Sequence, residues 1–99
     1  GADREMVQDA IDSVIAKEED LFLLEWESLG ANQKKALRLV AQAGPKSIFA
    51  GSNLARYRMS ASSLKKAVDG LIQKDLVDRT QDGWYMQDPL FAHYVRTRL

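Results

Sequence analysis

The hydrophobic pattern is clearest between residues 59 and 79, where a helical period gives way to an extended one. Apolar residues there recur at i, i+4, i+7 and i+8, the spacing of one helical face, and they are Leu64, Val68, Leu71 and Ile72. On the opposite side of the same helix lie Ser62, Lys66, Asp69 and Gln73. Ser60 can cap the first turn through its hydroxyl, so we expect a helix over residues 60–73. Residues 76–79 then alternate with the period of two that is typical of a β-strand.

The N-terminal part of the chain predicts two helices separated by polar residues. The first covers residues 3–18, with an apolar stripe made of Val7, Ala10, Ile11, Val14 and Ile15. The polar residues 17–20 predict a break. A dense apolar segment follows, and it predicts a second helix over residues 21–29 that ends at Gly30. We expect Phe22 and Trp26 to pack in the core, and a partner-docking surface is the alternative for this segment.

A third helix is predicted over residues 32–43, capped by Asn32 and ended by Gly44 and Pro45. Its buried stripe consists of Ala36, Leu37, Val40 and Ala41. Its outward positions are Lys34, Lys35, Arg38 and Gln42. Residues 46–49 are a candidate third strand. A short helix over residues 53–57, capped by Ser52 or Asn53, then leads through a turn into the helix at Ser60.

The segment after residue 79 predicts a hairpin and a last helix. Asp82 and Gly83 supply the positive φ angles of a tight turn, and residues 84–87 return as a second strand. Asp88 can cap the last helix, with Pro89 at its first position. The order helix, short helix, longer helix and hairpin predicts a mainly α fold of the winged helix-turn-helix class. Its core has three helices and its wing is the hairpin, and extra helices lie at both ends of the chain.

Charge is unevenly distributed along the 99 residues, although the net charge is zero. Residues 1–29 hold nine acidic and two basic side chains, a net charge of −7. Residues 30–66 hold eight basic side chains and no acidic one, so this stretch carries +8, while residues 67–99 carry −1. The basic stretch coincides with the predicted helix-turn-helix, which makes it a candidate face for nucleic acid. The alternative is a solvated surface, or an electrostatic contact with the acidic residues 1–29 or with an upstream domain.

Composition also limits the cellular context. The chain has no cysteine, so we expect a reducing compartment, the cytoplasm. The acidic N-terminus has no hydrophobic region like that of a signal peptide, and no apolar run is long enough for a membrane span. The chain does not begin with Met, so we expect a piece excised from a longer protein, with Gly1, alone or together with Ala2, left from cloning.

Catalysis finds little support in the residue types present. His93 is the single histidine, and acidic residues cluster at 18–20 and 25–27 on what we expect to be a solvated helical face. No set of His, Cys and Asp has the spacing of metal ligands. We therefore expect no catalytic residue, metal or cofactor in this chain.

Three runs of the sequence resemble the C-terminal winged-helix domain of the archaeal-type P-loop ATPases, a family also found in bacteria: SASSLKKAV from Ser60, LIQKDLV from Leu71 and GWYMQDPLF from Gly83. The resemblance covers roughly residues 21–99. It implies that residues 21–99 are the winged-helix domain and that residues 1–20 are the tail of an upstream ATPase lid. The nucleotide-binding motif of such ATPases lies upstream, and no G-x-x-x-x-G-K-[ST] is present here, so we expect this chain not to bind ATP by itself.

Duplex DNA is the partner that the predicted helix over residues 60–73 fits best. Ser62 and Lys66 face outward from its first two turns, where they suit base edges and phosphates of a major groove. The proposed DNA-binding residues are Arg56, Arg58, Ser62, Ser63, Lys65 and Lys66. Lys34, Lys35 and Arg38 are expected to touch the flanking backbone.

Two features count against DNA. Asp69 shares the outward face of the helix, and the predicted wing carries Asp78 and Asp82 with only Arg79 as a cation. The alternative function is a regulatory or protein-docking module that packs on the ATPase core or on a partner protein. Residues 21–26 with Trp84 and Tyr85 would then form the interface. The fold alone does not choose between these two functions.

Overall fold

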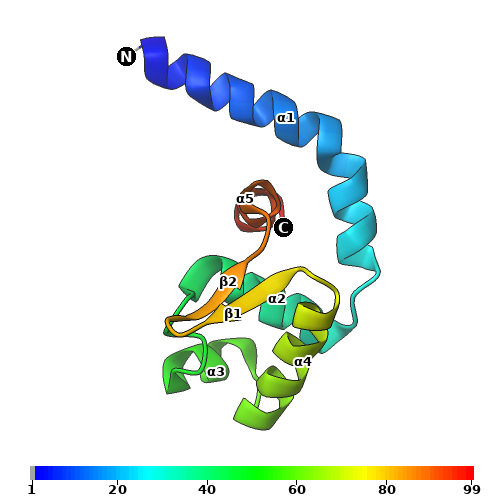
Figure 1. Cartoon of the computed structure of the whole chain (residues 1–99), viewed down its shortest axis with the longest axis vertical. Helices are drawn as coiled ribbons and strands as arrows, with labels where there is room; N and C mark the ends of the chain where they lie inside the picture. The colour runs from blue at the N-terminus through cyan, green and yellow to red at the C-terminus, as the bar shows by residue number, and fades with distance from the viewer. Residues whose placement is uncertain (1) are drawn as a thin grey trace.

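The computed structural model describes the backbone of residues 2–99 and the side chains of residues 6–99. Its elements in chain order are α1 (Ala2–Glu27), α2 (Ala31–Ala43), α3 (Gly51–Tyr57), α4 (Ala61–Gln73), β1 (Val77–Thr80), β2 (Gly83–Met86) and α5 (Pro89–Arg98). Figure 1 shows α2, α3, α4 and the hairpin as one body, with α1 passing over α5 and extending beyond it. This order confirms the winged-helix prediction. None of the described helices has both the length and the apolarity that crossing a bilayer requires.

Helix α1 is continuous, so the predicted break at residues 17–20 is wrong. These residues are Lys, Glu, Glu and Asp, and a polar run of this kind contains neither Gly nor Pro to interrupt the helix. Phe22 and Trp26 are buried, as expected for core residues. The predicted stripe of residues 7–15 is mostly exposed instead, because only Ile15 is fully buried and Ile11 is half-buried. The expectation for Gly1 lies outside the described residues.

The contact between α1 and α5 is aromatic. The ring of Phe22 lies 5.1 Å from that of Phe91 and 5.4 Å from that of Tyr94. Burial raises the pKa of the Tyr94 hydroxyl, and the nearby carboxylate of Glu19 raises it further. At the edge of this contact, Glu19 and Arg98 approach to 4.0 Å. The C-terminal half of α1 is therefore anchored to α5 by ring packing.

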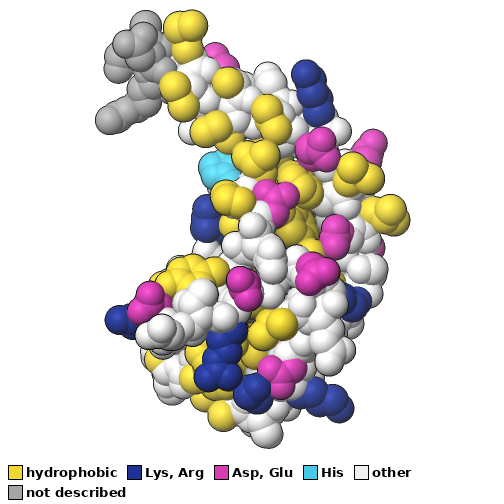
Figure 2. All heavy atoms as spheres, in the orientation of Figure 1, with side chains coloured by type: hydrophobic (Ala, Val, Ile, Leu, Met, Phe, Trp, Pro, Cys, Tyr) yellow, Lys and Arg dark blue, Asp and Glu magenta, His cyan; other side chains and the backbone are white. Residues whose placement is uncertain are grey.

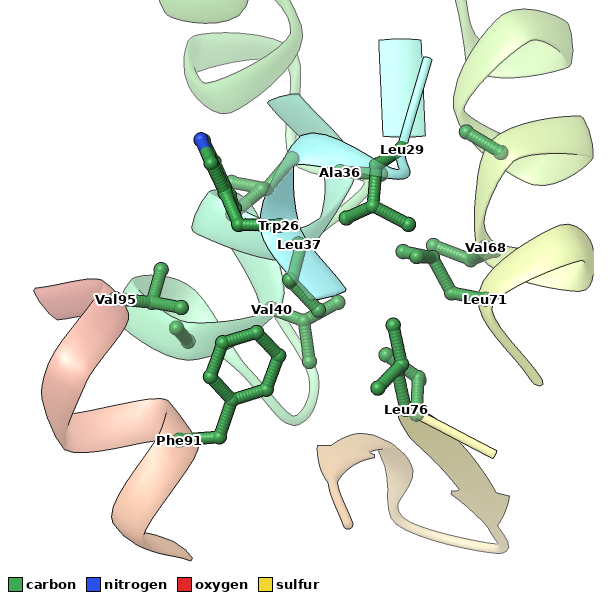
Figure 3. Packing of buried hydrophobic residues seen from close by; sticks show 14 of the residues in the cluster. Trp26, Leu29, Ala36, Leu37, Val40, Val68, Leu71, Leu76, Phe91 and Val95 are labelled. Atoms are coloured by element: carbon green, nitrogen blue, oxygen red, sulfur yellow. The ribbon is translucent and has the colours of Figure 1, made fainter. Parts of the chain in front are cut away.

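Helices α2 and α4 form the centre of the core. Leu37 of α2 and Leu64, Val68 and Leu71 of α4 are fully buried. Figure 3 shows Val68 and Leu71 pointing from α4 towards α2. Burial of each such side chain stabilises the fold by about 1.5–3 kcal/mol. Ile72, the fourth member of the predicted stripe, is only half-buried.

The predicted caps of α4 and α5 are confirmed, whereas those of α2 and α3 are wrong. The Ser60 hydroxyl accepts from the backbone N–H of Ser63 at 3.1 Å, and Asp88 Oδ1 accepts from that of Leu90 at 2.9 Å. Asn32 does not cap α2, which begins earlier at Ala31, and there the N–H of Gly30 donates to Gln33 Oε1 at 3.2 Å.

Helix α3 likewise begins earlier than predicted, at Gly51, with Ala50 rather than Ser52 or Asn53 as its N-cap. The Asn53 amide instead donates to the carbonyl of Ser47 at 2.6 Å. Neither start has a side-chain cap, so a polar side chain at the predicted cap position was not required.

The wing is a two-stranded antiparallel sheet in which Val77 pairs with Met86 and Thr80 with Gly83. Gly83 has a φ of 131°, whereas Asp82 has no positive φ, so Gly83 alone supplies the predicted backbone geometry. A Cβ at Gly83 would also collide with the carbonyl oxygen of Pro45. Residue 83 must therefore be glycine for two independent reasons.

Residues 46–49 do not form the predicted third strand. One hydrogen bond joins this link to the wing, from the Trp84 N–H to the Pro45 carbonyl at 3.2 Å. Ile48 is fully buried, and Phe49 lies with its ring 5.0 Å from that of Trp84. Turns let these two side chains reach the core, and a regular strand would point them to opposite faces.

Candidate nucleic-acid interface

The start of α4 presents a cluster of three serine hydroxyls. Ser60 Oγ donates to Ser63 Oγ at 2.9 Å and lies 3.2 Å from Ser62 Oγ. Ser62 is exposed and Ser63 is half-buried. Since a hydroxyl both donates and accepts, the outermost serine keeps hydrogen-bonding capacity for a ligand while the cap is maintained.

Lys65 and Asp69 form an ion pair one helical turn apart. Lys65 Nζ lies 2.7 Å and 2.9 Å from the two carboxylate oxygens of Asp69, and both side chains are half exposed. The pair neutralises the carboxylate that counts against an anionic ligand. It also occupies Lys65, so among the described residues of α4 the exposed Lys66 is the cation left for a phosphate.

A polar hollow of about 420 Å³ lies between the start of α2 and the first turns of α4. It brings Ser63 and Lys66 together with Asn32 and Gln33, which sequence reasoning did not include in the site. Gly70 forms part of its wall, and a Cβ there would come within 2.7 Å of the Gln33 amide nitrogen. The sequence shows a polar Asn-Gln pair at the start of α2. Only the packing of α2 against α4 places this pair beside the site.

Arg56 lies in the last turn of α3 and Arg58 is the residue that ends that helix, and both are exposed. Arg58 adopts a left-handed conformation, with φ 53° and ψ 51°, and so takes the place of the glycine common in such turns. The guanidinium of Arg56 lies 5.8 Å from the centre of the Tyr57 ring. The predicted phosphate contacts therefore precede the α4 face directly.

The basic residues of α2 are less exposed than predicted. The Arg38 guanidinium lies 5.2 Å and the Lys34 ammonium 5.8 Å from the centre of the Trp26 ring, and Lys34 is 3.6 Å from Glu27. Together with Lys35 and Tyr57, these side chains line a hollow of about 370 Å³. The tryptophan ring partly covers both charged groups, which explains the intermediate burial of Lys34 and Arg38.

The wing is as poor in cations as the sequence indicates. Asp78 and Asp82 are exposed, and the Arg79 guanidinium lies 4.9 Å from the centre of the Trp84 ring. Lys46, from the link before α3, lines a small hollow beside the hairpin tip with Arg79 and Asp82. This lysine was missed because its position next to the wing depends on the contact between Pro45 and Trp84.

The residues proposed for a docking surface divide between core and surface. Phe22 and Trp26 are buried, and Trp84 is half-buried between Phe49 and Arg79. Leu21, Leu23, Leu24 and Tyr85 are exposed.

The described residues include no group of three or more His, Cys, Asp and Glu placed to hold a metal ion. His93 is half-buried on α5, and its carbonyl accepts from the Thr97 hydroxyl at 2.7 Å.

Comparison with known protein families gives one match. A family described as a probable winged helix domain matches residues 20–97, which is most of the chain. Neither the comparison with curated proteins nor that with solved structures found a match. The family match supports the winged-helix fold and carries no link to a P-loop ATPase.

Proposed function

The chain belongs to the family of probable winged helix domains, and from that premise we propose that it binds duplex DNA through the exposed face of α4. The observation that carries this proposal is the arrangement around the start of that helix. Ser62 and Lys66 are exposed, Arg56 and Arg58 precede them, and the one acidic group of that face, Asp69, is paired with Lys65.

The electrostatic pattern agrees with a phosphate-bearing ligand. All eight Lys and Arg side chains of residues 30–66 fall in the helix-turn-helix, without an acidic side chain among them. Ser62 and Lys66 would meet the groove, and Arg56, Arg58 and Lys65 would meet phosphates. Ser63 and Lys66 line the hollow between α2 and α4 together with Asn32 and Gln33, whose amides would also lie within reach of the DNA. Lys65 would approach a phosphate while staying paired with Asp69, so that this carboxylate stays neutralised.

We also propose that this domain acts as the non-catalytic C-terminal part of a larger P-loop ATPase in the cytoplasm. The support is the resemblance in the runs from Ser60, Leu71 and Gly83. A gene product with G-x-x-x-x-G-K-[ST] upstream of these residues would agree with this context, and its absence would refute it.

The DNA proposal is tested by fluorescence anisotropy with a labelled duplex at several salt concentrations. The log of the affinity should fall linearly with the log of the salt concentration. The double variant Lys66→Ala with Arg58→Ala should bind more weakly, and the loss of the Arg58 phosphate contact should lower the slope by about 0.9.

The matched control is Lys17→Ala with Arg98→Ala, which removes the same charge from α1 and α5. If this control weakens binding as much as the α4 variant, the proposed face is wrong. If the unaltered chain shows no duplex binding at low salt, the DNA function is refuted.

Protein docking is the second candidate function, because large apolar side chains remain exposed on α1. A docking domain would copurify with the separately expressed ATPase core and show no affinity for duplex DNA. The two assays together therefore distinguish the candidates.

A further inference from the structure

Exposed large apolar side chains are concentrated on α1. Of the seven in the described part of the chain, six lie on this helix: Met6, Val7, Val14, Leu21, Leu23 and Leu24. Leu24 is 70% exposed, Leu21 61% and Val7 60%. Figure 2 shows hydrophobic side chains along α1 where it extends beyond the body of the molecule. Isolated exposed apolar residues are ordinary, but a set gathered on one helix indicates an interaction surface.

Five of the apolar residues of α1 form a continuous line, which we name the α1 stripe: Val7, Ala10, Val14, Leu21 and Leu24. Their spacing of alternately three and four residues, with Lys17 at one position, matches the a and d positions of a coiled-coil heptad. At 1.5 Å per residue the α1 stripe is about 25 Å long. It lies about a third of a turn from Ile15 and Phe22, which pack on the body, so a helix on the stripe would not displace α5.

Acidic side chains flank the α1 stripe. In the same heptad, Glu18 and Glu25 hold e positions, and Asp20 and Glu27 hold g positions. Residues 6–27 contain seven acidic side chains and one basic one, Lys17. Of these seven acidic side chains, only Glu19 and Glu27 form ion pairs with basic side chains of the described residues, which are Arg98 and Lys34. Since e and g charges select coiled-coil partners, this surface favours a partner with the opposite charge.

We propose that the α1 stripe binds an amphipathic helix of a partner protein whose apolar seam is flanked by Lys and Arg. A second copy of this chain fits less well, because parallel pairing in this heptad would place Asp20, a g residue of one copy, opposite Glu25, an e residue of the other. The proposal is independent of DNA binding, since it uses no residue of α4.

The test uses the chain of residues 1–99 and two labelled synthetic helical peptides. Both carry Leu at a and d; one carries Lys at e and g, and the other carries Glu. Fluorescence anisotropy should show binding of the Lys peptide and at least tenfold weaker binding of the Glu peptide. The double variant Leu21→Ser with Leu24→Ser should bind the Lys peptide at least tenfold more weakly.

The matched control is Leu23→Ser, because Leu23 is an exposed leucine of the same helix outside the α1 stripe. It should bind the Lys peptide as the unaltered chain does, and circular dichroism should show unchanged helix content for all variants. Duplex DNA affinity should be the same for all of them, which separates this proposal from the proposed function.

Three results would overturn the proposal. The first is no binding of the Lys peptide. The second is a loss in Leu23→Ser equal to that in the double variant. The third is a dimer of the unaltered chain in sedimentation equilibrium that the double variant abolishes, since the occupant would then be a second copy.

Discussion

Helices α1 and α4 both carry apolar stripes with a helical period, yet the stripe of α4 is buried and that of α1 is exposed. In α4, Leu64, Val68 and Leu71 are fully buried against α2 and the start of the wing. In α1, the residues buried on the body lie about a third of a turn away from the α1 stripe, whose Leu21 and Leu24 remain exposed. A periodic pattern therefore predicts a helix and an apolar face, but not whether the chain itself covers that face.

The two helices also differ in the charges beside their apolar residues. The exposed face of α4 carries Lys66 and an ion pair that cancels Asp69, whereas α1 is strongly acidic. If both proposals hold, the domain has two separate surfaces of opposite charge, one for a polyanion and one for a cationic helix. The predictions below test the contrast between the helices with matched substitutions.

The largest expected difference comes from the same substitution placed on each helix. Leu64→Ala should destabilise the fold by about 2–5 kcal/mol, because it opens a cavity among fully buried side chains. Leu24→Ala should change stability by less than about 0.5 kcal/mol, because its side chain is already in water. Urea denaturation measures both. A large loss in Leu24→Ala would show that the α1 stripe is covered in solution.

An intermediate difference is expected between two serines at helix ends. Ser60→Ala should cost about 1 kcal/mol, because the Ser60 hydroxyl caps the first turn of α4. Ser28→Ala is the matched change beside the end of α1, where the hydroxyl donates to the Glu25 carbonyl at 2.6 Å. It should cost less, because the exposed carbonyl can bond to water instead. Equal losses in thermal denaturation would contradict the capping role of Ser60.

The smallest expected effect concerns the ion pair of α4. Lys65→Ala should cost about 0.3–0.5 kcal/mol at low salt, and the loss should shrink as salt is added. Lys66→Ala, one residue away and with no ion pair among the described residues, should leave stability nearly unchanged. Denaturation of both variants at two salt concentrations measures the difference. A greater loss in Lys66→Ala would mean that this lysine has a structural role.

Much of the fold was predictable because its signals are local. The stripe of α4, the caps at Ser60 and Asp88, and the glycine of the hairpin each depend on residues close together in sequence. Predictions failed where a polar run or a polar side chain was given too much weight. Residues 17–20 continue the helix because they contain neither Gly nor Pro. Asn32 and Asn53 do not cap their helices, whose N-cap residues are Gly30 and Ala50.

The candidate site was predictable only in part. The exposure of Ser62 and Lys66 follows from the helical period, and the structure has both exposed. Their roles in DNA binding stay predictions. The proximity of Asn32 and Gln33 to α4, and of Lys46 to the wing, could not be predicted, because packing between separate elements creates both contacts.

By itself, the sequence determined the helical segments, the hairpin, and the side of α4 that faces away from the core. Side-chain size and backbone preference act over a few residues, so their consequences can be worked out from the order of residues. Tertiary structure alone decided that the aromatic side chain of Phe22 on α1 packs on α5 while the α1 stripe stays exposed. That outcome depends on which surfaces the rest of the chain can bring within contact distance, and a period of 3.6 residues contains no information about it.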